Sequence, residues 1–168
     1  MEIWDVYDAE GNLTGETAIR GNQLAPGQYH LVCDVLVRHA DGSYLCMKRS
    51  REKDMYPGYW EATAGGSALR GETALDCVRR ELLEETGIHC DTFIQVNSGR
   101  FDDRHYISRS YVCTVEVDKD TVRMQEGETE DYRWMTEGEF VDFLNSGEVI
   151  PTSFNRYRDY YEQLGYLK

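Results

Sequence analysis

The stretch from Gly66 to Ile88 constrains this chain more than any other, because it concentrates acidic residues at helical spacing. Glu81, Glu84 and Glu85 lie three and four residues apart, so in a helix, at about 100° per residue, their carboxylates share one arc of about 100°. Like charges four residues apart cost roughly 0.2–0.5 kcal/mol. Acids in the last turn oppose the helix dipole by about 0.3–1 kcal/mol each. A helix that carries both penalties is expected to be built around a cation.

Capping residues and an apolar stripe mark the limits of this helix. Thr73, with Asp76 three residues later, predicts an N-cap and a capping box, and Gly87 predicts the C-terminal stop. Apolar residues recur at helical spacing beside the acids, as expected for a helix on the rim of a hydrophobic core. This predicted stripe consists of Ala74, Leu75, Val78 and Leu82.

The chain is strongly acidic, with 31 acidic against 18 basic residues and a formal net charge of −13. Nonspecific binding to nucleic acid polymers or to anionic membranes needs a basic surface, so this charge argues against both partners. No apolar run approaches the roughly 18 residues of a membrane span, and the first residues carry no signal-peptide pattern.

The cysteines indicate a reducing compartment. Their number is odd, and no two of them have the C-x2-C spacing that is typical of structural zinc sites. We interpret them as reduced thiols in or near the core of a cytoplasmic protein. The five are Cys33, Cys46, Cys77, Cys90 and Cys113.

The length of 168 residues predicts a single domain over residues 1–168. Residues 1–20 predict an N-terminal β-hairpin extension, because two strand-like segments flank a turn-rich stretch. Strands that outnumber helices, without strict alternation, favour an α+β fold with a mixed sheet between helices. The pattern predicts further strands at 30–38, 43–49, 59–64, 93–101, 106–117 and 132–135, and further helices at 137–145 and 153–164.

The spacing within the acidic helix resembles the Nudix box, G-x5-E-x7-R-E-U-x-E-E-x-G-U, where U is a bulky aliphatic residue. Every defined position agrees, and these positions are Gly66, Glu72, Arg80, Glu81, Leu82, Glu84, Glu85, Gly87 and Ile88. The motif covers 23 of the 168 residues, and Nudix domains usually have this chain's length. The resemblance implies an α/β/α sandwich and a hydrolase that acts on small phosphorylated molecules.

A divalent metal assists hydrolysis of a diphosphate, because it lowers the pKa of bound water and neutralises phosphoryl charge. Mg²⁺ and Mn²⁺ prefer hard oxygen ligands, which a carboxylate cluster supplies. The family resemblance assigns Glu84 and Glu85 to the metal, leaves Glu81 as either ligand or base, and implies that Arg80 orients a glutamate. It also implies that the carbonyl of Gly65, just before the box, turns towards the metal.

The resemblance points to residues outside the box as well. Family members often recruit a further acid six residues before a tryptophan that opens a strand, and Trp134 places this position at Glu128. A solvated acidic loop is the alternative interpretation of Glu128. Lys48 and Arg49 end a predicted strand where the family often contacts phosphate, and ordinary surface charge is their alternative interpretation.

The segment from Glu2 to Gly11, with His30 and the sequence Lys48-Arg49-Ser50, resembles the Nudix branch that contains isopentenyl-diphosphate isomerase. The isomerases use a cysteine where this chain has Ala64, and an alanine can neither deliver nor remove a proton. The branch therefore indicates ancestry, whereas the intact box indicates hydrolysis.

We predict a metal-dependent pyrophosphohydrolase that cleaves a phosphoanhydride bond of a nucleoside diphosphate derivative or a related organic diphosphate. The alternatives are isopentenyl-diphosphate isomerase, which product analysis would distinguish, and a noncatalytic ligand-sensing Nudix domain, against which the intact set of acids argues. The expected partner is a small phosphorylated substrate. The sequence leaves open whether the chain is a monomer or a homodimer.

Overall fold

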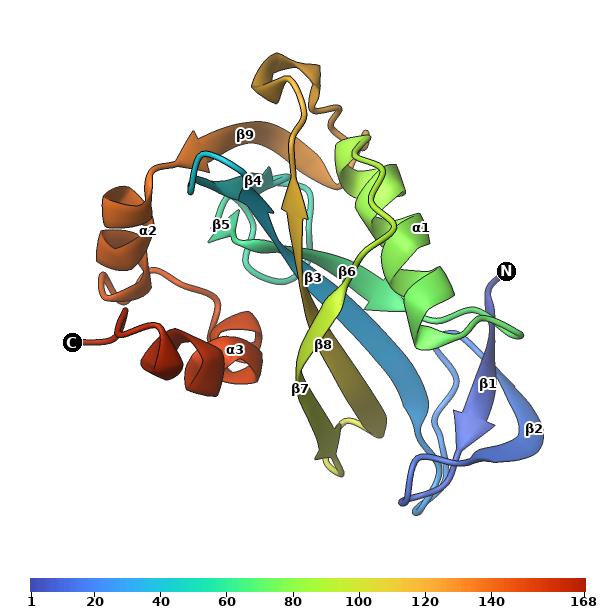
Figure 1. The fold of residues 1–168 in the computed structure, drawn as a ribbon. Coiled ribbons are helices and arrows are strands. Elements are labelled where there is room, and N and C mark those ends of the chain that lie inside the picture. The colour runs from blue at the N-terminus through green and yellow to red at the C-terminus, as the bar shows by residue number, and fades with distance from the viewer.

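The structure, a computed structural model, describes all residues from 1 to 168. A mixed β-sheet lies between α1 on one side and α2 and α3 on the other, and a separate hairpin packs near the N-terminal end of α1 (Figure 1). The strands are β1 (Ile3–Tyr7), β2 (Leu13–Ile19), β3 (His30–His39), β4 (Tyr44–Arg49), β5 (Trp60–Glu61), β6 (Thr63–Ser67), β7 (Ile94–Phe101), β8 (Tyr106–Val115) and β9 (Thr129–Met135). The α-helices are α1 (Ala74–Thr86), α2 (Glu137–Leu144) and α3 (Pro151–Gln163).

Strand β3 organises the seven-stranded main sheet. It pairs in parallel with β8 along its whole length, from His30 opposite Tyr106 to His39 opposite Val115. Its other edge pairs with β6 in antiparallel fashion, and β4 joins β3 and also pairs with β5 and β9. Because β6 leads directly into α1, this pairing places the start of the acidic helix beside the middle of the sheet.

Alternation along β3 divides its side chains between two cores, as expected for a strand covered on both faces. Cys33, Val35 and Val37 are buried on the side of α1, in a core of aliphatic residues and thiols. Leu36 points to the opposite face and joins a second core under α2 and α3. This second core is rich in aromatic residues, namely Tyr44, Phe140, Tyr157, Tyr161 and Tyr166. The layers confirm the predicted α+β sandwich.

The acidic helix α1 has the ends that the sequence predicts. Thr73 Oγ1 accepts a hydrogen bond from the Asp76 backbone N–H at 3.2 Å, and the Asp76 carboxylate accepts one from the Thr73 N–H at 2.9 Å. Gly87 follows the helix in the left-handed conformation, at φ 72°, which favours glycine.

The predicted apolar stripe of α1 is wrong at Leu75, which is 39% exposed. The residues that α1 buries fully all come later along the helix, whereas Ala74 at its start is partly buried against the core. These buried residues are Cys77, Val78, Leu82 and Thr86.

The predicted N-terminal hairpin is confirmed, and it packs against β3 and against the loop before α1. Strands β1 and β2 pair as a two-stranded sheet of their own. Trp4 stacks on His30 with ring centroids 4.0 Å apart. The Gly71 backbone N–H donates to the Asp5 carboxylate at 2.7 Å. These contacts fix the hairpin beside the segment that leads into α1.

Two predicted strand boundaries are wrong. Gly65 and Gly66 do not follow a strand but lie inside β6, where they pair with Asp34 and Cys33. Strand β9 begins at Thr129, three residues before the predicted start, because its first residues continue the pairing with β4. In both places the partner strand extends a segment whose own residues are typical of turns.

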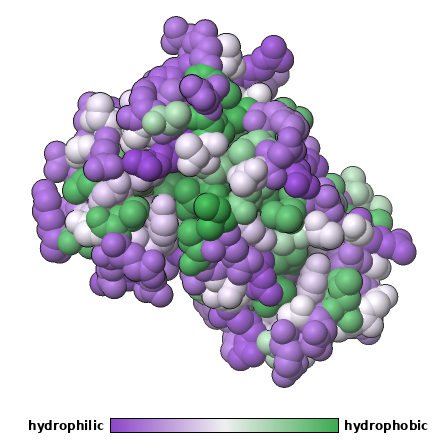
Figure 2. Space-filling model, in the orientation of Figure 1, coloured by the Kyte–Doolittle hydropathy of each residue, from purple (hydrophilic) through white to green (hydrophobic).

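Apolar residues are mostly inside the molecule. Four of the five cysteines are buried, and all five are free thiols, as predicted. The surface seen from the side of Figure 1 is largely hydrophilic, with hydrophobic residues visible mainly in the middle of this face (Figure 2). No helix is both long enough and apolar enough to cross a lipid bilayer.

Candidate active site

A polar cavity of about 380 Å³ is bounded by α1, β6, β3 and the N-terminal hairpin. Its walls contain seven carboxylates and five cationic side chains, so the carboxylates exceed the cations by two when all are ionised. This excess equals the charge of one divalent metal ion. The carboxylates belong to Glu2, Asp34, Glu61, Glu81, Glu84, Glu85 and Glu128, and the cations to Arg20, Arg49, Lys53, Arg80 and Arg156.

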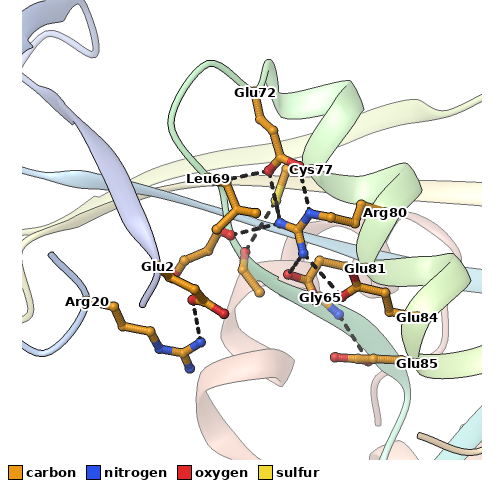
Figure 3. Close-up of polar contacts among 12 residues, drawn as sticks. Glu2, Arg20, Gly65, Leu69, Glu72, Cys77, Arg80, Glu81, Glu84 and Glu85 are labelled. Atoms are coloured by element: carbon orange, nitrogen blue, oxygen red, sulfur yellow. Dashed lines mark hydrogen bonds and ion pairs between the residues drawn. The ribbon is translucent and has the colours of Figure 1, made fainter. Parts of the chain in front are cut away.

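Arg80 donates hydrogen bonds to several acids of α1 and of the loop before it (Figure 3). Its Nε and Nη2 donate to the two carboxylate oxygens of Glu72 at 2.6 and 2.9 Å, and its Nη1 donates to Glu81 at 2.7 Å. Its Nη1 also reaches Glu84 at 3.3 Å, and its Nη2 donates to the Ser67 carbonyl at 3.1 Å. Although burial opposes the effect, these hydrogen bonds hold the pKa of Glu72 below its usual value. One guanidinium therefore positions three glutamates.

Among the three glutamates of α1 that line the cavity, Glu85 is the one that forms no ion pair. It is half-buried near the end of α1 and accepts one hydrogen bond, from the Gly65 backbone N–H at 3.3 Å (Figure 3). Enclosure by protein raises the pKa of Glu85 well above its usual value, and the charges of Glu61 and Glu81 raise it further. Burial also raises the pKa of Glu81, even though Arg80 opposes this shift. Such carboxylates are short of positive charge.

The two glycines of β6 allow close approach by different neighbours, namely α1 at Gly66 and β3 at Gly65. A Cβ atom on Gly66 would lie 2.5 Å from Oε1 of Glu81, and one on Gly65 would lie 2.3 Å from the carbonyl oxygen of Cys33. Both separations are far shorter than van der Waals contact. The missing side chain at Gly66 therefore leaves room for the Glu81 carboxylate of α1, whereas the missing side chain at Gly65 leaves room for strand β3.

A family model described as a NUDIX domain matches residues 28–155, which include the whole acidic helix. The chain belongs to the Nudix family. An uncharacterized Nudix hydrolase of Listeria monocytogenes is 38% identical over 160 residues, which cover 92% of this chain and 91% of the relative. An uncharacterized Nudix hydrolase of Listeria innocua is 36% identical with the same coverage. The predicted family and enzyme class, a Nudix hydrolase, are confirmed.

Solved structures agree in fold. DR0079 from Deinococcus radiodurans has a TM-score of 0.70 at 17% identity, with 94% of this chain and 98% of that chain covered. A MutT protein from Methanosarcina mazei has a TM-score of 0.58 at 24% identity, with 80% and 91% covered. These likenesses confirm the Nudix fold, a mixed sheet with three helices. The resemblance to the isomerase branch stays a prediction.

The two cations predicted on β4 have different surroundings. Arg49 lines the cavity, and its Nη1 donates to Glu61 at 3.0 Å. Lys48 does not line the cavity and pairs instead with Glu130 at 2.9 Å. Successive side chains of a strand point to opposite faces, which explains why only one of two neighbours faces the site.

Glu128 lines the cavity from the residue just before β9 and forms an ion pair with Lys53. The prediction for Glu128 depends on a tryptophan at the start of a strand. Trp134 instead lies near the end of β9. The role of Glu128 as a metal ligand stays a prediction.

Sequence reasoning missed an ion pair in the opposite wall of the cavity. Arg156 of α3 donates from Nη1 to Asp34 of β3 at 2.6 Å and from Nη2 to the Tyr106 hydroxyl at 3.3 Å. The Tyr157 hydroxyl donates to the other oxygen of Asp34 at 3.2 Å. One signal could have revealed this pair, since a lone acid within an apolar strand needs a buried partner. The sequence also did not predict three other residues that line the cavity, and no local pattern marks them: Glu61, Lys53 and Arg20.

The donor set suits a hard divalent cation, because carboxylate oxygens are the ligands that such cations prefer. The structure does not hold these donors in a ready-made site, since no three His, Cys, Asp or Glu side chains converge as metal ligands. Glu81 and Glu84 form ion pairs with Arg80, and Glu128 forms one with Lys53. The predicted metal ligands, namely Glu81, Glu84, Glu85, Gly65 and Glu128, therefore stay a prediction.

Ala64 bears on the isomerase alternative. It is 3% exposed and packs in the core on the α1 side of the sheet, and it does not line the cavity. Its neighbours Thr63 and Gly65 do line it. Position 64 therefore lacks an acid or base and also points away from the site.

Proposed function

We propose that this Nudix hydrolase is a metal-dependent pyrophosphohydrolase, with Mg²⁺ or Mn²⁺ as its cofactor. The proposed reaction cleaves a phosphoanhydride bond of a nucleoside diphosphate derivative or a related organic diphosphate. The observation that supports it most is the half-buried carboxylate of Glu85, which has no cation partner in a cavity whose carboxylates outnumber its cationic side chains by two. Nudix hydrolases typically depend on a divalent metal. Without a bound cation, such a cavity would repel a diphosphate.

The acids of α1 divide the roles in this proposal. Glu84 and Glu85 hold the metal, Glu81 is a ligand or the base, and the carbonyl of Gly65 and the carboxylate of Glu128 are further ligands. When bound, the metal supplies Lewis acidity and lowers the pKa of a water molecule.

Arg80 orients the cluster in this proposal. Its hydrogen bond to Glu81 keeps that carboxylate against β6, while Glu72 fixes the other side of the guanidinium. Because a planar guanidinium binds carboxylates through paired hydrogen bonds, a lysine could not replace Arg80.

Cations near the acids are proposed to bind the substrate's phosphates. Arg49 faces the cavity and supports this role, whereas the neighbouring Lys48 lies outside the cavity walls. Lys53 also faces the cavity, so it is proposed to bind phosphate together with Arg49. Each of them is paired with a glutamate, which a phosphate group would have to displace.

A hydrolysis screen tests the proposed function. The candidates are nucleoside diphosphate sugars, dinucleoside polyphosphates, nucleoside triphosphates and prenyl diphosphates, each assayed with Mg²⁺, with Mn²⁺ and with EDTA. ADP ribose is included because the NUDIX domain of Shewanella oneidensis NrtR, a neighbour in fold at 17% identity and a TM-score of 0.54, was crystallised with it. We expect metal-dependent turnover of at least one diphosphate and none in EDTA.

The variant Glu85→Gln keeps the shape of the side chain and removes its charge. We expect it to lower turnover by about 100-fold or more, as for loss of a group that stabilises charge in the transition state. Glu126→Gln is the matched control, because Glu126 is exposed in the loop of Glu128 but does not line the cavity. Wild-type turnover by Glu85→Gln on a confirmed substrate would contradict the proposal and favour a ligand-binding domain.

Isopentenyl diphosphate separates hydrolysis from isomerisation. We expect no dimethylallyl diphosphate, because position 64 has no group that could transfer a proton and lies in the core. Mass-resolved chromatography of the products measures this directly. Formation of the allylic isomer faster than phosphate release would overturn the hydrolase assignment.

A further inference from the structure

The N-terminal hairpin places an ion pair at the cavity wall that faces α1 (Figure 3). Arg20, just after β2, donates from Nη1 to Oε2 of Glu2, just before β1, at 2.7 Å. Both side chains line the cavity, although both lie outside residues 28–155, which the NUDIX domain model matches. The hairpin therefore adds charged groups of its own to the site that the domain builds.

Arg20 is held more loosely than the other arginines of the cavity. Arg80 contacts three carboxylates, and Arg156 contacts Asp34 and a tyrosine hydroxyl, with side chains 23% and 15% exposed. The Arg20 side chain is 63% exposed and has one partner, Glu2, which is itself 45% exposed. An exposed ion pair contributes little to stability, so Arg20 can exchange Glu2 for another anion at small cost.

The position of Arg20 is nevertheless fixed, because the backbone around it is anchored. The Arg20 N–H donates to the Glu2 carbonyl at 3.0 Å, which closes the hairpin at its open end. The Arg70 N–H donates to the Ile3 carbonyl at 2.8 Å, which joins the hairpin to the loop before α1. An exposed guanidinium with one ion-pair partner, on an anchored backbone, is suited to bind an anion that enters the cavity.

We propose that Arg20 forms an anion subsite at the cavity wall, which binds a phosphate or carboxylate group of the substrate, and that Glu2 occupies Arg20 until the substrate arrives. The inference rests on the proposed function, in which the scissile diphosphate lies at the acids of α1. It narrows the substrate class to organic diphosphates that carry another anionic group beyond the bond that is cleaved. Arg20 pairs well with such groups, since a guanidinium binds phosphate or carboxylate through two parallel hydrogen bonds.

Calorimetric titration with a triphosphate analogue tests the subsite without turnover. The probe is bis(methylene)triphosphonate, whose P–C–P bridges cannot be hydrolysed, titrated in excess Mg²⁺. We expect Arg20→Ala to weaken binding about tenfold, equal to about 1.4 kcal/mol. Glu2→Gln is expected to strengthen binding about threefold, because it releases Arg20. These opposite signs distinguish an anion subsite from a purely structural ion pair, whose loss from either side would have the same effect.

Two further variants serve as controls. Arg158→Ala removes an exposed arginine of α3 whose ion pair with Glu162 has similar exposure, 59% and 55%, but lies outside the cavity, and we expect no change in binding. In the double variant with Arg20→Ala, Glu2→Gln is expected to lose its effect, because a double-mutant cycle isolates the contribution that passes through Arg20.

The inference is overturned if the wild type does not bind the probe, if Arg20→Ala changes the Kd less than twofold, or if Glu2→Gln strengthens binding equally without Arg20. The proposed function is judged separately, by metal-dependent hydrolysis that Glu85→Gln abolishes. Hydrolysis with no effect of Arg20→Ala would reject only the subsite. The expected pattern of binding without metal-dependent hydrolysis would reject the proposed function and the substrate class that rests on it, and would leave Arg20 as an anion-binding group.

Discussion

Two walls of the same cavity treat a carboxylate in opposite ways. In the wall formed by β3 and α3, Asp34 is 3% exposed and receives hydrogen bonds from Arg156 and from Tyr157. In the wall formed by α1, Glu85 is more exposed, yet its hydrogen-bond donor is a single backbone N–H. The more deeply buried acid is satisfied and the more accessible acid is not.

The difference separates structural from functional charge. A buried carboxylate is tolerated when a cation and hydroxyl groups complete its hydrogen bonding, and it then contributes to a fixed structure. A carboxylate that faces a cavity without a cation costs stability, and it recovers this cost when it binds one. Asp34 belongs to the first class, and under the proposed function Glu85 belongs to the second.

The largest effect is expected from breaking the satisfied pair. Arg156→Ala leaves Asp34 buried without its cation, which typically costs about 3–5 kcal/mol of unfolding free energy. Urea denaturation measures this loss. Arg158→Ala, two residues along α3, removes an exposed ion pair and should cost less than about 1 kcal/mol. Equal losses in the two variants would remove the distinction between the walls.

The second-largest expected effect is stabilisation of the folded protein by a metal ion that binds at the α1 wall. A cation that binds only the folded state stabilises it by about 2.7 kcal/mol at a hundredfold excess over its Kd. We therefore expect millimolar Mg²⁺ or Mn²⁺ to raise the melting temperature of the wild type. Ca²⁺ should also stabilise the protein but support little turnover, because it prefers a looser geometry. A melting curve that ignores all three ions would contradict the metal assignment.

Replacing a carboxylate by an amide should change the stability in opposite directions in the two walls. Without metal, Glu85→Gln is expected to stabilise the protein by roughly 0.5–1.5 kcal/mol, because it relieves repulsion with Glu81 and an unfavourable contact with the helix dipole. Asp34→Asn is expected to destabilise it, because Arg156 loses its counter-charge. Thermal unfolding in EDTA compares the two variants, and shifts of the same sign would contradict the comparison.

The smallest expected effect is a pH dependence. Because the pKa of Glu85 is raised from about 4.5 in the folded state, the unfolded chain releases this proton first as the pH rises. The stability of the wild type relative to Glu85→Gln should therefore be greatest below pH 4.5 and fall as the pH rises through the folded pKa. Taking the difference between the two proteins in EDTA removes the titrations of groups that do not interact with Glu85, and leaves those of Glu85 and of its neighbours Glu61 and Glu81. A difference independent of pH would contradict the raised pKa.

The sequence predicted those parts of the site that depend on neighbouring residues. Thr73, Asp76 and Gly87 define α1 through local hydrogen bonds, and the acid spacing follows from the helix alone. The contact of Asp34 with Arg156 joins residues 122 positions apart, and no local pattern specifies it. The prediction for Leu75 is wrong for a related reason, because the helix period places it on the apolar stripe whereas the tertiary packing leaves it exposed.

Long-range pairing of β4 with β9 also has a consequence for the order of folding. Helix α1 can form early from local contacts, whereas Glu85 comes near Glu61 and Glu128 only after β4 has paired with β5 and with the distant β9. Interactions made after the folding transition state change the unfolding rate and leave the folding rate nearly unchanged. We therefore expect a metal ion that binds the completed site to lengthen the lifetime of the native state without shortening the time the chain takes to reach it.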